Sequence, residues 1–283
     1  MTQPQDQKWL LRVRGLTKIY GEPSKNTIER TGPNFASNIC PETGAIVAIA
    51  NIDFDLYPGE VLGIVGESGS GKSTMVQLLY FDQEATDGRV LFGAVDEGRT
   101  NLLGLSNQRK RYVRNHLMGM VYQNPRDGLN FSFSSGGNIA EKLLMAGTFH
   151  VGDIRGRASY LLTQTEVPVQ RMDETPASFS GGMQQRVQIS KAIANNPPLV
   201  FLDEVTSGLD VSVQAKVLDL IRKLQNELGI SMIVVSHDLG VIRMLTDRTI
   251  VLKHGRIVEH GLTDQILQDP QHAYTQLLVS SLL

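Results

Sequence analysis

The stretch Gly66-Glu67-Ser68-Gly69-Ser70-Gly71-Lys72-Ser73-Thr74 fits the pattern G-x-x-x-x-G-K-[ST], in which a glycine-rich loop holds phosphate. The residues before it, Val61 to Val65, form a short apolar run that predicts a buried strand. The residues after it, Ser73 to Tyr80, contain no proline or glycine and carry several apolar side chains, which predicts a helix. A strand, a glycine loop and a helix in this order are the context that the pattern requires. They predict a binding site for a nucleoside triphosphate.

The residue types of this loop suit phosphate binding. Glycine tolerates positive φ, so Gly66, Gly69 and Gly71 let several backbone N–H groups point at one anion. The helix that follows adds the positive end of its dipole. The pattern places the Lys72 ammonium at the β- and γ-phosphates and the Ser73 hydroxyl on Mg²⁺. A flexible glycine–serine turn is the alternative interpretation, and the lysine and serine at their expected offsets argue against it.

The composition of the 283 residues is that of an ordinary globular protein, with 41% hydrophobic and 20% charged residues. A formal net charge of −2 provides no general attraction to nucleic acid or to an anionic membrane. A single cysteine excludes an intrachain disulfide and fits a reducing compartment. The polar start predicts no secretory signal, and no apolar run is long enough to predict a transmembrane segment. We therefore expect a cytoplasmic location, with any membrane role exerted through a partner.

Strand-like and helix-like segments alternate along the chain, which predicts an α/β fold with a mainly parallel sheet. Strands are expected at 10–13, 16–20, 51–56, 61–65, 89–92, 118–122, 199–202, 230–235, 249–253 and 256–259. Helices are expected at 73–80, 213–228, 265–267 and 273–283, and residues 124–191 have the mostly helical pattern of an inserted subdomain. The basic cluster Arg109-Lys110-Arg111 with Arg114 predicts a solvated helix face rather than a nucleic-acid patch.

Residues 21–45 interrupt this alternation, because prolines and glycines break any periodicity there. A loop this long inside a compact domain is usually functional or disordered. It ends in Cys40-Pro41-Glu42-Thr43-Gly44, which is similar to a zinc knuckle whose second cysteine is Thr43. A zinc site needs about four ligands, and Cys40 is the only cysteine of the chain. We therefore expect residues 21–45, called the excursion below, to bind no metal.

A second glycine motif, Phe179-Ser180-Gly181-Gly182-Met183-Gln184-Gln185-Arg186, opens a predicted helix. It resembles the L-S-G-G-Q signature of the ABC-type ATPases, the nucleotide-binding subunit family, and the resemblance extends over nearly the whole chain. It implies a P-loop NTPase core with a mainly parallel sheet, an N-terminal antiparallel β part and the inserted helical subdomain at 124–191. The implied ATPase domain covers 9–260, and 261–283 is a C-terminal tail.

The resemblance implies roles for single residues at matching positions. Asp203, at the end of a predicted strand, corresponds to the carboxylate that holds Mg²⁺, and Glu204 to the general base that polarises the attacking water. Gln123 corresponds to the loop glutamine that senses Mg²⁺ and that water. His237 corresponds to the switch histidine at the γ-phosphate, and Tyr20 to the aromatic residue that stacks on adenine. An acidic strand cap, a structural histidine and a core tyrosine are the ordinary alternatives.

The resemblance also implies a homodimer around two Mg-ATP, because the signature closes over the γ-phosphate bound to the other subunit. Ser207-Gly208-Leu209-Asp210 resembles the loop that crosses that dimer interface. The implied catalytic residues are Lys72, Gln123, Glu204 and His237, and the implied Mg²⁺ ligands are Ser73, Gln123 and Asp203. The implied ATP contacts are Tyr20, Gly66, Glu67, Ser68, Gly69, Ser70, Gly71, Lys72, Ser73, Thr74, Ser180, Gly181, Gly182 and Asp210.

Two positions depart from the family pattern. Met183 stands where the signature usually has glutamine, which weakens a polar contact and leaves the serine and both glycines in place. Val205 stands where a proline usually follows the catalytic glutamate. Because proline would restrict φ at that position, the loop after Glu204 is expected to be looser, and ATP hydrolysis is expected to remain.

Within the family, the chain resembles the ATP-binding subunits of phosphonate-degrading C–P lyase systems and, beyond them, those of dipeptide and oligopeptide importers. The distinguishing stretches are Asp127-Gly128-Leu129, Ser135-Gly136-Gly137-Asn138-Ile139 and His150-Val151-Gly152-Asp153-Ile154-Arg155. A C–P lyase core complex is therefore the expected partner. The alternative partners are the membrane permeases of an importer for peptides or phosphonates, which would place the chain at the inner membrane. A DNA-repair clamp is disfavoured by the neutral charge and the lack of long heptad repeats, so no direct nucleic-acid contact is expected.

The segment from Asn124 to Arg155 is the predicted partner surface. It lies between Gln123 and the signature, so it is placed to respond to the nucleotide. Phe131 and Phe133 are candidate aromatic anchors of the kind that binding hot spots use. The alternative is that both phenylalanines fill the core of the helical subdomain.

Overall fold

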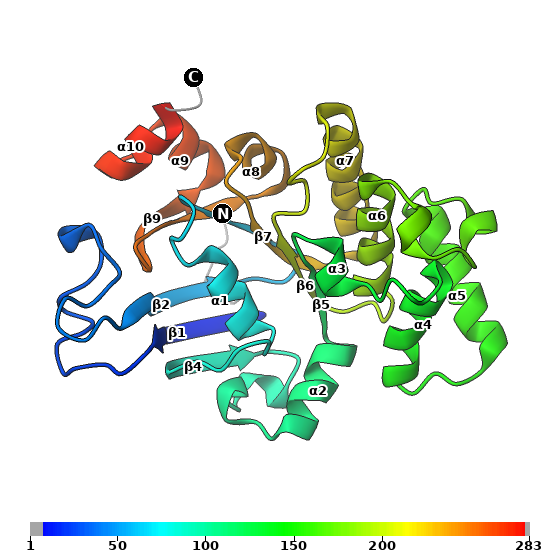
Figure 1. Ribbon diagram of the computed structural model, residues 1–283, viewed down its shortest axis with the longest axis horizontal. Helices are drawn as coiled ribbons and strands as arrows, with labels where there is room; N and C mark the ends of the chain where they lie inside the picture. The colour runs from blue at the N-terminus through cyan, green and yellow to red at the C-terminus, as the bar shows by residue number, and fades with distance from the viewer. Residues whose placement is uncertain (1–7, 281–283) are drawn as a thin grey trace. The chain divides into compact units, whose positions relative to one another are not determined.

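The computed structural model describes residues 8–280 (Figure 1). The chain divides into two compact units. Of the described residues, the first unit contains 8–110 together with 233–280. The second unit is Arg111–Met232. The segment 124–191, expected to be helical, lies inside the second unit.

An antiparallel sheet of three strands forms one layer of the first unit. Its central strand β1 (Leu11–Tyr20) lies between β2 (Ile46–Leu56) and β4 (Asp87–Phe92). The sequence predicted two strands in the place of β1, and this is wrong. Gly15 has φ 60° and the register shifts beside it, so the strand passes through an irregularity without ending.

The phosphate-loop strand belongs to a second group of strands in the same unit. Strand β3 (Val61–Val65) is buried throughout and pairs in parallel with β8 (Arg248–Lys253). Strand β9 (Arg256–Leu262) returns antiparallel to β8. His254 and Gly255 join β8 to β9 with φ of 44° and 72°, the left-handed values of a tight hairpin turn.

Short helices complete the first unit. The helices are α1 (Lys72–Leu79), α8 (Leu239–Leu245), α9 (Thr263–Gln268) and α10 (Ala273–Ser280), and the 3₁₀ segments are η1 (Pro33–Phe35), η2 (Asp96–Gly98) and η3 (Leu102–Gly104). Helix α8 was not expected from the sequence, because it is short and carries Gly240 in its first turn. The Asp238 carboxylate accepts hydrogen bonds from the backbone N–H groups of Gly240 and Val241, which caps this helix.

The second unit combines helices with a parallel strand pair. Strands β5 (Met118–Val121) and β6 (Leu199–Asp203) pair in parallel and are buried. The helical elements are α3 (Pro125–Gly128), α4 (Ser135–Met145), α5 (Val151–Gln164), η4 (Val169–Arg171), η5 (Pro176–Ser178), α6 (Gly181–Ala192) and α7 (Val211–Leu228). Gly229, with φ 63°, ends α7 as the sequence predicts. The boundaries between the units fall in α2 (Asn107–His116) and β7 (Ser231–Val235).

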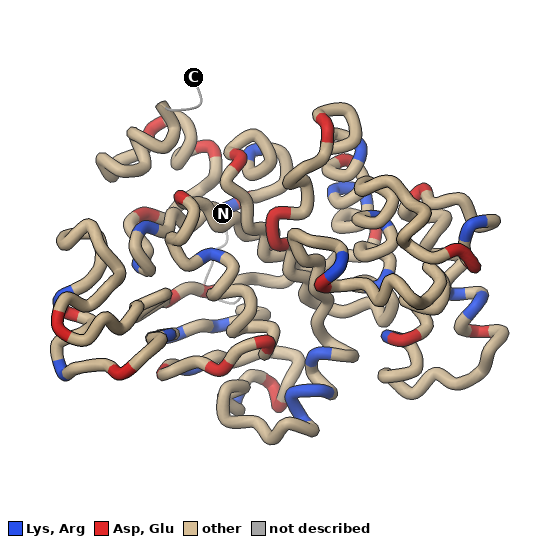
Figure 2. The backbone as a smooth tube through the Cα atoms, viewed as in Figure 1, with Lys and Arg blue, Asp and Glu red and all other residues tan. Residues whose placement is uncertain are grey.

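The expected fold class is confirmed: the chain is α/β, with an N-terminal antiparallel sheet and parallel strand pairs beside an antiparallel hairpin. The basic cluster of α2 forms the longest blue run in Figure 2, and Arg109 and Arg111 within it are exposed. Arg109 pairs with Asp96 at 2.9 Å. Among residues 8–280, no helix combines the length and apolar character that crossing a membrane demands.

Candidate nucleotide site

Three glycines shape the phosphate loop as the sequence predicts. Gly66, Gly69 and Gly71 have φ of 151°, 78° and 103°, values that side chains rarely allow. A Cβ atom at Gly66 would lie 2.2 Å from the Leu252 carbonyl oxygen, and one at Gly71 would lie 2.3 Å from the Ala48 carbonyl oxygen. The loop is therefore packed against the ends of two strands and has no room for side chains at these two positions.

Polar groups converge on the same loop. The Lys72 ammonium, at the start of α1, donates to the carbonyl oxygens of Gly66 at 2.8 Å and Glu67 at 2.9 Å. The buried Ser70 hydroxyl has no hydrogen-bond partner among residues 8–280. A cation and an unpaired hydroxyl beside a glycine-lined cradle suit an anionic ligand with several oxygen atoms. The loop geometry thus matches the chemistry of a triphosphate.

Tyr274 contacts the loop and was missed by the sequence reasoning. It lies on α10, and its hydroxyl oxygen accepts a 3.0 Å hydrogen bond from the Glu67 backbone N–H. The Lys253 ammonium lies 4.4 Å from the centre of its ring. Burial raises the pKa of Tyr274. Helix α10 therefore stabilises the phosphate loop through Tyr274. No local sequence pattern predicts this contact.

Tyr274→Phe is expected to lower the free energy of unfolding by about 1 kcal/mol, because the Glu67 N–H loses its acceptor while the ring still packs. Urea denaturation of the nucleotide-free protein measures this change. Tyr160→Phe is the matched control, since Tyr160 lies exposed on α5. Equal midpoints for Tyr274→Phe and the parent protein would show that the hydroxyl contributes nothing.

Tyr20, the predicted adenine-stacking residue, ends β1 in the first unit. Its hydroxyl donates to the Gln83 side-chain oxygen, and the Gln83 amide donates to Gln77 of α1 at 2.6 Å. The Lys18 ammonium lies 4.9 Å from the centre of the Tyr20 ring. Two hydrogen bonds therefore connect the tyrosine to the helix that follows the phosphate loop, and its ring remains partly exposed.

His237 follows β7 as predicted and is exposed. The neighbouring backbone positions it, because the Ser236 N–H donates to the Ile64 carbonyl of β3 at 3.2 Å. The Asp238 N–H in turn donates to the Ser236 hydroxyl at 3.0 Å. The histidine is thus held beside the strand that leads into the phosphate loop.

The second unit places Gln123 and the acidic pair at one edge. Strands β5 and β6 are parallel and in register, with Val121 opposite Leu202. Gln123 follows β5, while Asp203 ends β6 and is buried. Because the carboxyl ends of parallel strands meet at one edge of a sheet, these polar residues lie together there.

Glu204 has an unusual backbone conformation. Its φ is 51°, in the left-handed region that few non-glycine residues adopt. The Ser207 N–H donates to the Glu204 carbonyl at 3.0 Å, and the Gln123 amide donates to the Ser207 hydroxyl at 3.4 Å. Strained backbone of this kind is concentrated at functional sites. Val205, which stands where the family usually has proline, is buried.

The signature residues open α6 and pack on the start of α7. The Ser180 hydroxyl accepts a 3.4 Å hydrogen bond from the Met183 N–H as the N-cap. A Cβ atom at Gly182 would lie 2.4 Å from Cγ1 of Val213. Asp210 caps α7 by accepting from the Val213 N–H at 3.0 Å, and this hydrogen bond lowers the pKa of Asp210. The structure therefore brings the signature and the predicted dimer-interface loop together within one unit.

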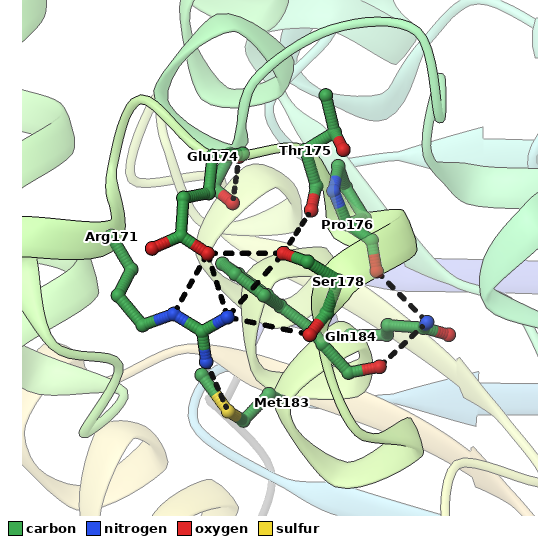
Figure 3. A network of polar contacts seen from close by, with 9 residues as sticks. Arg171, Glu174, Thr175, Pro176, Ser178, Met183 and Gln184 are labelled. Atoms are coloured by element: carbon green, nitrogen blue, oxygen red, sulfur yellow. Dashed lines mark hydrogen bonds and ion pairs between the residues drawn. The ribbon is translucent and has the colours of Figure 1, made fainter.

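A polar network around Arg171 supports the segment that leads into the signature (Figure 3). The guanidinium donates to Oε2 of Glu174 at 3.0 and 2.7 Å and to the Ser178 carbonyl at 3.3 Å. It also lies 4.4 Å from the centre of the Phe179 ring and donates to the Met183 sulfur at 3.6 Å. Hydrogen bonding by Arg171 holds the pKa of Glu174 below its usual range. Met183 thus takes part in this network, a contact that the sequence did not indicate.

Comparison with known proteins identifies the class. The family model described as "ABC transporter" matches residues 49–207, more than half of the chain. The chain therefore belongs to the ABC transporter family, as one of its ATP-binding and ATP-hydrolysing subunits.

Individual relatives agree with this assignment. The chain is 50% identical to the putative phosphonates utilization ATP-binding protein PhnK of Escherichia coli, over 83% of this chain and 91% of that protein. It is 39% identical to a putative peptide import ATP-binding protein of Brucella abortus, over 88% and 75% of the two chains. The dimeric structure of an ATP-binding cassette bound to ADP and Pi matches with a TM-score of 0.74 and 28% identity, covering 89% and 98% of the two chains.

Proposed function

We propose that the phosphate loop binds the triphosphate of ATP and that Glu204 activates the attacking water. The glycine cradle and the Lys72 ammonium support the first role, because they match the shape and charge of a triphosphate. The strained backbone of Glu204 beside the end of β6 supports the second role. Gln123 and His237 assist at the γ-phosphate, as the family resemblance implies.

Mg²⁺ is the proposed metal cofactor. Its ligands are the Asp203 carboxylate, the Ser73 hydroxyl and the Gln123 amide oxygen, all hard oxygen donors of the kind that Mg²⁺ prefers. Among residues 8–280 there is no cluster of three or more His, Cys, Asp and Glu side chains able to hold a metal. Mg²⁺ sites in ATPases use one or two carboxylates together with the phosphates of the substrate, so this donor set fits. The ion neutralises charge on the phosphates.

The ATP-bound form is proposed to be a homodimer that holds two Mg-ATP. Ser180, Gly181 and Gly182 stand at the N-terminus of α6, where backbone N–H groups and the helix dipole favour an anion. In the dimer this cradle covers the γ-phosphate bound to the other subunit, and Asp210 lies at the interface. The dimeric cassette that resembles the chain supports this arrangement.

The proposed biological role is to drive conformational change in a C–P lyase complex that degrades phosphonates, in the cytoplasm. The observation that carries this proposal is the 50% identity to PhnK over most of both chains, against 39% to the peptide import proteins. The second candidate is an importer motor that docks on membrane permeases, and the peptide import relatives favour it. Purification of the tagged full-length chain, with mass spectrometry of bound proteins, separates the two by recovering either lyase subunits or permeases.

The proposed partner surface is the segment from Asn124 to Arg155. Phe133 within it is 46% exposed, so it does not fill the core of the helical unit. Phe131 is half-buried, and the Arg126 guanidinium lies 4.7 Å from the centre of its ring. Phe133 is therefore the stronger candidate for an anchor.

Phe133→Ala is expected to abolish co-purification of the lyase subunits while ATPase activity and melting temperature stay near those of the parent chain. Loss of an aromatic anchor that the partner buries costs about 2 kcal/mol or more of binding free energy at a hot spot. Tyr160→Ala is the matched control, because Tyr160 is exposed to a similar degree, at 47%, but lies on α5 outside the segment from Asn124 to Arg155. If Phe133→Ala is stable and still retains the partner, the docking surface lies elsewhere.

A further inference from the structure

Three exposed apolar side chains form a row at one end of the first sheet. Tyr20 lies directly opposite Ile46 in the pairing of β1 and β2, and Ile46 lies directly opposite Ile39 of the excursion. Residues directly opposite one another in antiparallel strands point to the same face, with Cβ atoms about 4.5–5.5 Å apart. Tyr20, Ile46 and Ile39 are 38%, 40% and 51% exposed. One face of the sheet therefore presents an aromatic ring followed by two branched aliphatic side chains.

The excursion at 21–45 supplies the outer member of this row. Backbone hydrogen bonds of 2.8 Å on either side of Ile39 and Ile46 join the excursion to the start of β2. They leave the two isoleucines as a non-hydrogen-bonded pair, the geometry in which facing side chains lie closer together. A two-residue turn is sufficient to connect antiparallel strands. The excursion is longer than the connection requires, and the extra chain adds apolar surface beside Tyr20.

Internal contacts hold Ile39 in place. Thr27 and Cys40 are both buried, and the Thr27 hydroxyl donates to the Cys40 sulfur at 3.6 Å. The Arg256 guanidinium of β9 donates to the Ile28 carbonyl at 3.0 Å, which ties the excursion to the hairpin. Isoleucine is β-branched and has few side-chain rotamers. A ligand that covers the row would therefore restrict little additional motion.

The row is close to the phosphate loop along β2. Ala48 is in close contact with the loop, because a Cβ atom at Gly71 would lie 2.3 Å from the Ala48 carbonyl oxygen. Ile46 is two residues from Ala48, a distance of about 6.6 Å along a strand. On the other strand, the hydrogen bonds through Gln83 and Gln77 connect Tyr20 to α1. The row therefore begins two residues of β2 away from the position against which the phosphate loop packs.

We propose that Ile46 and Ile39 extend the adenine platform beyond Tyr20, so that the base of ATP lies over all three side chains. This inference rests on the proposed function, in which the phosphate loop binds the triphosphate of ATP, and on the stacking of adenine on Tyr20 that the family resemblance implies. The flat apolar face of adenine is the part of ATP that gains from covering aliphatic side chains, whereas the triphosphate gains nothing from them. Ile39 and Ile46 therefore strengthen the binding of ATP but not that of a triphosphate without a base.

The test compares two ligands, ATP and inorganic tripolyphosphate, by isothermal titration of the full-length chain. Ile39→Thr and Ile46→Thr keep the β-branched shape and remove one apolar contact each. Each variant is expected to weaken ATP binding about three- to fivefold, as covering part of an isoleucine side chain predicts. Binding of tripolyphosphate stays unchanged. Phe35→Thr is the matched control, because Phe35 is exposed on the same excursion but lies outside the row.

The outcomes separate the inference from the function on which it rests. If Tyr20→Ala weakens ATP binding while both isoleucine variants bind ATP like the parent chain, the proposed role of the isoleucines is wrong and the nucleotide site is not affected. Equal weakening of ATP and tripolyphosphate in the isoleucine variants would also overturn it, since the effect would not act through the base. If neither Tyr20→Ala nor Lys72→Ala weakens ATP, the proposed nucleotide site itself is wrong. Thermal melting of each variant establishes that the fold is retained.

Discussion

Glu204→Gln is expected to lower the rate of ATP hydrolysis by about 10²–10⁴-fold, the usual contribution of a general base. The amide keeps the size and hydrogen-bonding capacity of the side chain but cannot accept the proton of the attacking water. Binding of ATP is expected to remain at the level of the parent chain, because the phosphate loop is unchanged. A phosphate-release assay and titration with a fluorescent ATP analogue measure the two quantities.

The same variant is expected to accumulate the ATP-bound dimer, since hydrolysis no longer separates the two subunits. Light scattering with saturating Mg-ATP measures the mass of the particle. Glu227→Gln is the control, because Glu227 is near the end of α7 and pairs only loosely with Lys223, at 4.0 Å. A monomer for Glu204→Gln under these conditions contradicts the proposed dimer, and equal hydrolysis in the variant and the parent chain contradicts the role of Glu204.

Lys72→Ala is expected to weaken ATP binding by about 10- to 100-fold, as the loss of a charged hydrogen-bond donor predicts. The Lys72 ammonium lies within the glycine loop, where it donates to two backbone carbonyls of that loop. It is therefore already positioned beside the cradle for the phosphates. Titration with the fluorescent ATP analogue measures the loss.

The contrast between the two substitutions tests the division of roles. Lys72→Ala acts on binding, whereas Glu204→Gln acts on the chemical step. Lys223→Ala is the control for the lost charge, because Lys223 is exposed on α7 and is expected to leave ATP affinity unchanged. Equal losses of ATP affinity in Lys72→Ala and Glu204→Gln would contradict the assignment of Glu204 as the general base.

The sequence by itself was sufficient to predict the phosphate loop, the strand before it and the helix after it. Left-handed φ at Gly66, Gly69 and Gly71, the strand before them and the helix after them are all set by neighbouring residues. The same holds for the β8–β9 hairpin and for the end of α7 at Gly229. The signature was recognisable for the same reason, because its serine cap and glycines are consecutive.

Local patterns failed where pairing or packing outweighs propensity. The sequence predicted two strands at 10–13 and 16–20, yet β1 continues through Gly15 because β2 and β4 hold it on both sides. Helix α8 was missed because Gly240 lies in its first turn, and the Asp238 cap stabilises the helix despite that glycine. In both cases contacts with the surroundings decided the conformation.

Only the tertiary structure revealed the contacts between residues far apart in the chain. The Tyr274 hydroxyl accepts a hydrogen bond from the Glu67 N–H, 207 positions away in the sequence. The Val213 side chain leaves no space for a Cβ atom at Gly182. Ile39 joins the row beside Tyr20 only because the excursion folds back onto β2. Backbone conformation and periodicity are properties of consecutive residues and can be read from them, whereas these contacts depend on how distant segments pack, which no local pattern encodes.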